Sequence, residues 1–348
     1  MKRIQSFDLA RGFTVLIMPS IHVIMLYSIP SVQQSFLGDV LAFIAEGPGA
    51  QLFMLLMGVG FTLSSKINKK SVFKRALLLL VAAYGLNFLK FIVPLGLGLM
   101  PPNLLAELQQ DDNYTSVPFF LLLGDILHFA MIAYLPLYLV YRLPRYYYWS
   151  LCLAILIIFI SPMVWDLQTG IGALDYILQL LGGHPPVAFF PVFPWLVYPL
   201  IGMTLGFLLK KFDQNMVIKM AGWFGLAIII FSFSFPATTE PTDWLPFYRT
   251  WPADTIFHLG FVLVWLAVIH WLSKKIKFNP FSKLLEFCSK NITSIYLIQW
   301  VLICWCLALT GYLQLNMMKS FCWMIGITTF TLLLTYAIKK SNAQPKNI

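Results

Sequence analysis

The chain has 348 residues, of which 59% are hydrophobic and only 11% are charged. Soluble domains carry roughly 25% charged residues, so this composition excludes an ordinary soluble protein with one membrane anchor. The net charge of +10 does not indicate a nucleic-acid partner, because the basic residues lie in small clusters between apolar runs. The five cysteines show neither disulfide nor metal-ligand spacing, so no metal site is predicted.

Apolar runs of about 20 residues, the length that spans a bilayer, recur along the whole chain. Such long runs exclude the ten-residue alternation of membrane β-barrel strands. We therefore predict an all-α, polytopic membrane protein of about ten helices, folded as a single domain over residues 1–348. In chain order, the predicted helices cover residues 9–29, 42–65, 75–96, 118–141, 147–165, 187–209, 216–235, 254–272, 288–311 and 320–338.

The positions of the basic residues predict the orientation of these helices. If the N-terminus is cytoplasmic, all but Arg11, Lys90, Arg249 and Lys319 of the 24 lysines and arginines fall in cytoplasmic loops or tails. This distribution follows the positive-inside rule, and with ten helices it places both termini in the cytoplasm.

Several ionisable residues interrupt the first four predicted helices at a similar depth. They are His22, Glu46, Lys90 and the pair Asp125 and His128. At about 1.5 Å per residue, all of them lie roughly 6 to 15 Å below the outer membrane surface. Ionisable groups are costly in a bilayer, so their common level predicts a functional site. For Lys90, snorkelling of the long side chain to the interface is an equally good interpretation.

His22 and Glu46 lie on either side of one predicted hairpin. The sequence Glu46-Gly-Pro-Gly-Ala50 predicts a broken helix start that lines a cavity. A histidine beside a carboxylate is a general-base arrangement, in which the carboxylate orients the imidazole. The same pair would also serve a proton relay, so a proton-coupled transporter or exporter remains the alternative function.

Arg11 lies near the cytoplasmic end of the helix that contains His22, roughly 16 Å away from it along the helix axis. One interpretation is an i,i+3 ion pair with Asp8. The other is a contact for phosphate groups at the inner mouth of a channel. The second suits an extended ligand whose reactive end reaches His22.

Four segments of the chain resemble the heparan-alpha-glucosaminide N-acetyltransferase-like membrane proteins. The spacing of Arg11 and His22 is similar to the Arg–His signature of the broader transmembrane acyltransferase superfamily. Two departures of this chain from its relatives favour a bacterial type with a single histidine. Relatives often have a histidine near the position where this chain has Gln299. The lysosomal enzymes have a histidine in the loop that follows the position of His22, and this chain has none in that loop. The four segments are residues 3–18, 49–58, 190–202 and 289–299.

The resemblance implies a membrane-embedded acyltransferase in a bacterial plasma membrane. It would move an acyl group, usually acetyl, from cytoplasmic acyl-CoA to a sugar hydroxyl or amine of a glycan or glycolipid outside. His22 would be the catalytic base near the thioester, oriented or recharged by Glu46 or Asp125. The implied partners are the lipid bilayer, acetyl-CoA and the acceptor, and a homodimer is left open.

The resemblance also implies roles for residues away from the reacting atoms. Arg11 and Lys74 would contact the CoA phosphates, and Lys90 is assigned to the same donor site. Trp195 and Tyr198 offer aromatic faces for an acceptor sugar ring, and His128 is assigned to the same acceptor site.

Overall fold

The computed structural model describes residues 4–65, 67–110, 116–235, 245–275 and 279–343. The chain forms two compact units. Unit 1 consists of Met1–Phe7, Glu46–Ala83 and Leu122–Ile276. Unit 2 consists of Asp8–Ala45, Tyr84–Leu121 and Lys277–Ile348.

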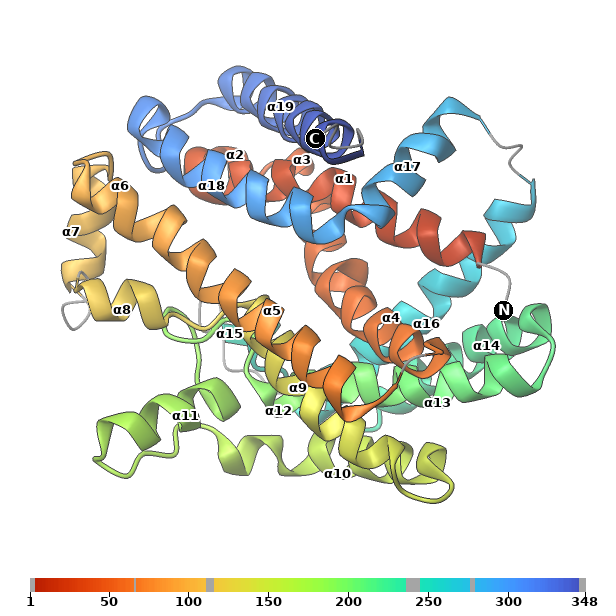
Figure 1. Cartoon of the computed structure of the whole chain (residues 1–348). Helices are drawn as coiled ribbons and strands as arrows, with labels where there is room; N and C mark the ends of the chain where they lie inside the picture. Colours follow the sequence, from red (N-terminus) through yellow and green to blue (C-terminus); the bar gives the residue numbers. More distant parts are fainter. Residues whose placement is uncertain (1–3, 66, 111–115, 236–244, 276–278, 344–348) are drawn as a thin grey trace, which may run out of the picture. The chain divides into compact units, whose positions relative to one another are not determined.

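The described residues form helices and no β-strand, as the all-α prediction requires (Figure 1). Nine helical segments of these residues are long and apolar enough to cross a membrane, and Ile126–Tyr141 is a shorter apolar helix. The chain is therefore a polytopic membrane protein. The segments that match the ten predicted helices are α1 (Gln5–Tyr27), α3–η1–α4 (Phe36–Leu63), α5–η2–α6 (Lys69–Gly96), α8 (Val117–Leu122) with α9 (Ile126–Tyr141), α10 (Tyr146–Val164), α12 (Val192–Trp195) with α13 (Val197–Lys211), α14 (Gln214–Ser232), α16 (Pro252–Lys275), α18 (Ile292–Thr310) and α19 (Met317–Ala343).

Five further helices are too short for hydropathy to predict as membrane spans. They lie in the connections between the long helices (Figure 1). These helices are α2 (Pro30–Gln33), α7 (Pro102–Gln110), α11 (Gly172–Gly182), α15 (Leu245–Tyr248) and α17 (Pro280–Lys290).

The predicted continuous helix 118–141 is wrong, because the chain leaves the helix between α8 and α9. Gly124 instead pairs with the segment before α12: its N–H donates to Val187 O (2.8 Å), and its carbonyl accepts from Phe189 N (2.9 Å). Asp125 then caps α9, since its carboxylate accepts from the backbone N–H of Ile126 at 2.7 Å. Asp125 therefore lies at a helix start and not within a helix.

Two long helices contain a π-helical turn, and each turn holds a predicted site residue. Glu46 lies in η1 (Ala45–Gly49), where Pro48 lacks the N–H that a regular helix needs. Lys90 lies in η2 (Phe88–Ile92), a turn that no local feature of the sequence predicts. π-turns within α-helices are frequent at functional sites.

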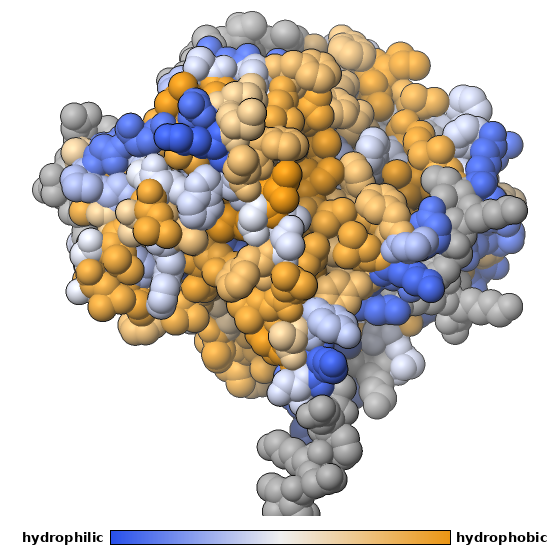
Figure 2. Space-filling view, turned by 90° about the horizontal axis from the view of Figure 1, so that it is seen from above, coloured by the Kyte–Doolittle hydropathy of each residue, from blue (hydrophilic) through white to orange (hydrophobic). Residues whose placement is uncertain are grey.

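Small residues let pairs of helices in unit 1 approach closely. Gly58 of α4 lies against the carbonyl of Pro199, and Gly202 of α13 lies against the carbonyl of Leu55. Gly206, one turn further along α13, lies against Thr62 of α4, so the Gly202–Gly206 spacing is a small-residue pattern of closely packed membrane helices. Outside these contacts, many large apolar side chains are exposed on the long helices, as a lipid-facing surface requires. Hydrophobic residues cover most of the face seen in Figure 2.

Candidate functional site

In unit 2, Arg11 is part of a small polar cluster near the start of α1. Its Nη2 lies 3.2 Å from Asp8 Oδ1, the i,i+3 pair that was one interpretation of the sequence. The same buried carboxylate oxygen accepts from Ser289 Oγ at 2.9 Å. About a third of the Arg11 side chain remains exposed.

His22, three helical turns further along α1, lies against the indole of Trp300 from α18. The two ring centroids are 4.1 Å apart. The ammonium of Lys90 lies 4.7 Å from the centroid of the Trp300 ring and 4.8 Å from that of Phe91. Lys90 is only 2% exposed, so the snorkelling interpretation is wrong. The structure thus brings both His22 and Lys90 to one aromatic ring.

Hydrogen bonds to backbone carbonyls hold α18 against α1 and η2. The hydroxyl of Tyr27 in α1 donates to Ile303 O at 2.7 Å. The indole N–H of Trp305 donates to Leu89 O, inside the π-turn, at 2.8 Å. A π-turn leaves carbonyls out of the regular i→i+4 pattern, so an external donor suits this position.

In unit 1, Glu46 and Asp125 both act on one phenol. Burial raises the pKa of the Tyr248 hydroxyl, and the nearby carboxylates of Asp125 and then Glu46 raise it further. The turn η1 that holds Glu46 is itself fixed: Gln51 Nε2 donates to Glu46 O at 2.7 Å, and Gly47 packs against the ring of Phe261. Tyr248 is a candidate site residue that no feature of the sequence indicated.

Trp195 and Tyr198 belong to an aromatic cluster in unit 1. Their ring centroids are 5.5 Å apart, and the Trp195 indole donates to Tyr248 O at 2.8 Å. Both side chains are almost completely buried in this structure. Trp195 thus contacts Tyr248 directly, and contact of Trp195 or Tyr198 with an acceptor sugar stays a prediction.

His128 has a structural role that its predicted depth did not reveal. Its Nδ1 accepts from the backbone N–H of Asp125 at 3.1 Å, which completes a capping box at the start of α9. An Nδ1 that accepts places the ring proton on Nε2. Lys74, assigned to the donor phosphates, is an exposed residue of α5 in unit 1.

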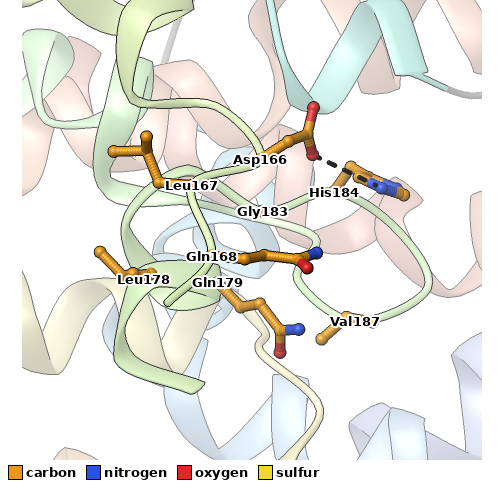
Figure 3. Close-up of a pocket in the computed structure, with 8 residues that line it drawn as sticks. All are labelled: Asp166, Leu167, Gln168, Leu178, Gln179, Gly183, His184 and Val187. Carbon is orange, nitrogen blue, oxygen red and sulfur yellow. Dashed lines mark ion pairs between the residues drawn. The ribbon is translucent and has the colours of Figure 1, made fainter. Parts of the chain in front are cut away.

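A small pocket lies beside the loop after α10 (Figure 3). Arg249 donates two hydrogen bonds to the Asp166 carboxylate, at 2.9 and 2.6 Å, and His184 Nε2 lies 3.7 Å from it. The bonds from Arg249 lower the pKa of Asp166. The pocket has a volume of about 40 Å³, which admits only a few water molecules. It is therefore too small to be a site for acyl-CoA.

The described residues contain no group of three or more His, Cys, Asp and Glu side chains that could hold a metal ion. The side chains that the structure brings together in each unit offer acid–base and electrostatic chemistry. In unit 2 the groups involved are an imidazole, an indole and an ammonium, and in unit 1 they are two carboxylates near a phenol.

The family model described as heparan-alpha-glucosaminide N-acetyltransferase, catalytic, matches residues 3–234. These residues include α1 to α14 and all nine site residues that the sequence predicted. No curated protein matches the chain.

Proposed function

Because the chain belongs to the heparan-alpha-glucosaminide N-acetyltransferase catalytic family, we propose that it transfers acetyl from cytoplasmic acetyl-CoA to a carbohydrate outside the membrane. Family membership makes it an acetyltransferase-type enzyme, and its long apolar helices make it a multi-pass membrane protein. The observation that best supports the finer proposal is the contact of His22 and Lys90 with one indole in unit 2.

In the proposed reaction, His22 is the general base. Its imidazole would accept the proton of an acceptor hydroxyl or amine while that oxygen or nitrogen attacks the thioester carbonyl. The ammonium of Lys90 would stabilise the negative charge that develops on the carbonyl oxygen. The carbon–sulfur bond then breaks, and the imidazolium returns its proton to the leaving CoA thiolate.

Arg11 supports a donor that enters from the cytoplasm. With the N-terminus in the cytoplasm, α1 would hold a guanidinium near its inner end and His22 in its outer half. The phosphates of acetyl-CoA would contact Arg11, since guanidinium groups bind phosphates with paired hydrogen bonds. We assign the acidic pair Glu46 and Asp125, which both act on Tyr248, to the acceptor side.

The test is acetyl transfer by purified protein in liposomes. With acetyl-CoA and a mixture of sugars, we expect an acetylated sugar or a slow release of CoA thiol. His22→Ala should abolish both. Ser20→Ala, two residues away in α1, is the matched control and should keep full activity. Full activity in His22→Ala would contradict the assignment of the base.

A proton-coupled transporter or exporter is the alternative, supported by the buried ammonium of Lys90. The two functions differ in their response to the donor. An acetyltransferase should show a higher melting temperature with acetyl-CoA, whereas a transporter should show no CoA-dependent shift and no transfer of labelled acetyl.

A further inference from the structure

Gln299 of α18 is a buried amide that the protein does not satisfy. Its side chain is completely buried, and neither Oε1 nor Nε2 has a hydrogen-bond partner among the residues that the structure describes. Buried polar groups in folded proteins are nearly always hydrogen-bonded. An amide with both its donor and its acceptor unmatched therefore indicates a ligand that has one of each.

The position of Gln299 along α18 is level with His22 of α1. Trp300 meets His22, and three residues later Ile303 O accepts from Tyr27. Residue numbers rise together on both helices, so α1 and α18 run parallel. Gln299, next to Trp300 in the chain, therefore lies at the height of the imidazole.

Gln299 also belongs to the face of α18 that packs within unit 2. At about 100° per residue, its side chain points within about 40° of the direction of Ile303. Ile303 is completely buried in a cluster that includes Val23 and Ile24 of α1. The unmatched amide thus faces the interior beside α1, and not lipid.

We infer that Gln299 binds the amide of the pantetheine arm of the donor that lies closest to the thioester. This inference rests on the proposed function, with the thioester at His22. In an acyl-CoA this amide is separated from the sulfur by only two methylene groups. Oε1 would accept from the amide N–H, and Nε2 would donate to a second carbonyl of the donor, since the carbonyl of a trans amide points away from its N–H.

The test compares two short donors that differ in this group alone. S-acetyl-N-acetylcysteamine keeps the amide, and in 2-(acetylthio)ethyl acetate an oxygen replaces the N–H. Each is measured as a donor and as a competitive inhibitor of transfer from acetyl-CoA. We expect the wild-type protein to prefer the amide compound at least tenfold, because the ester leaves Gln299 Oε1 buried and unmatched.

Gln299→Met should remove this preference, so that the two compounds differ by less than about threefold. Thr310→Val is the matched control on the same face of α18. Its hydroxyl already donates to the carbonyls of Cys306 and Gly311, so its loss should leave the tenfold preference intact.

A stability measurement separates ligand binding from a structural role. Gln299→Met replaces an unmatched buried amide with an apolar side chain of similar length, so the melting temperature without donor should stay the same or rise. The increase in melting temperature on addition of acetyl-CoA should shrink. A structural amide would give a lower melting temperature and an unchanged preference for the amide compound.

Different results would contradict the acetyltransferase function and the role of Gln299. If the wild-type protein neither transfers nor hydrolyses acetyl from acetyl-CoA, the proposed function is wrong. If it is active with acetyl-CoA but treats the amide and ester compounds equally, the role of Gln299 is wrong. The second comparison needs only the wild-type protein, so it decides the matter even if Gln299→Met does not fold.

Discussion

The imidazole of His22 and the indole of Trp300 lie ring against ring, with centroids 4.1 Å apart and planes inclined by 32°. The two residues come from helices at opposite ends of the chain, α1 and α18. An indole packed against the imidazole at this distance restricts the orientation of the imidazole.

Trp300→Leu should therefore lower kcat. A looser imidazole spends less time in a productive orientation, and misplacement by about 1 Å can cost on the order of a hundredfold in rate. We expect a fall of ten- to a hundredfold in steady-state transfer from acetyl-CoA, with a smaller fall for Trp300→Phe. Trp223→Leu removes an exposed indole of α14 and should leave kcat unchanged. Normal kcat in Trp300→Leu would show that the ring contact is incidental.

Arg11→Gln should raise the KM for acetyl-CoA about tenfold, because a charge-assisted bond to phosphate is lost. Acetyl-pantetheine lacks the nucleotide phosphates, so its KM should not change. The comparison separates phosphate binding from the Asp8–Arg11 ion pair. Asp8→Asn removes the partner and keeps the guanidinium, and it should preserve the difference between the two donors. Equal effects of Arg11→Gln on both donors would support the structural interpretation.

Alanine substitutions at Gly58 and Gly60 of α4 should have opposite effects on the stability of the protein. A Cβ at Gly58 would clash with the carbonyl of Pro199, so Gly58→Ala should destabilise the protein by about 1–3 kcal/mol. A Cβ at Gly60 meets nothing within 4 Å, so Gly60→Ala should stabilise the helix by up to about 1 kcal/mol. Thermal unfolding in detergent measures both. A similar melting temperature for the two variants would contradict the close approach of α4 and α13.

The Asp166–Arg249 pair should make stability depend on acid pH. The pKa of Asp166 is lowered from its ordinary value of 3.8, so the ionised form stabilises the folded state. This contribution is complete above about pH 5 and is lost as the pH falls through the lowered pKa. Between pH 6 and 5, the melting temperature of Asp166→Asn should lie below that of the wild-type protein by a constant amount. The difference should shrink as the pH falls from about 5 to 3, and a constant difference down to pH 3 would contradict the pairing.

Most of the membrane helices could be predicted because apolar run length is a direct property of the sequence. The break between α8 and α9 could not. The residues on both sides of Gly124 and Asp125 are apolar, and the break depends on backbone hydrogen bonds from Gly124 to Val187 and Phe189. Such pairing between segments about 60 residues apart leaves no local pattern.

For the candidate site, the depth argument found His22 and Lys90, which the structure brings to the same indole. It did not find Trp300 or Gln299. An aromatic residue in an apolar helix looks like any other core residue, so Trp300 carried no signal. Gln299 did carry one, since a neutral amide within an apolar run is also costly to bury, although less so than the ionisable groups on which the depth comparison rests.

The π-turn at Lys90 has a consequence for how relatives should be aligned. A π-turn contains one residue more than a regular α-helical path of the same course. A relative that lacks this residue would have a regular helix here, and every side chain beyond the deletion would rotate by about 100°. Lys90 would then no longer point to the position of Trp300. The direction of the ammonium is thus set by the length of the chain within the helix as well as by the residue type, and an alignment without a gap would hide the difference.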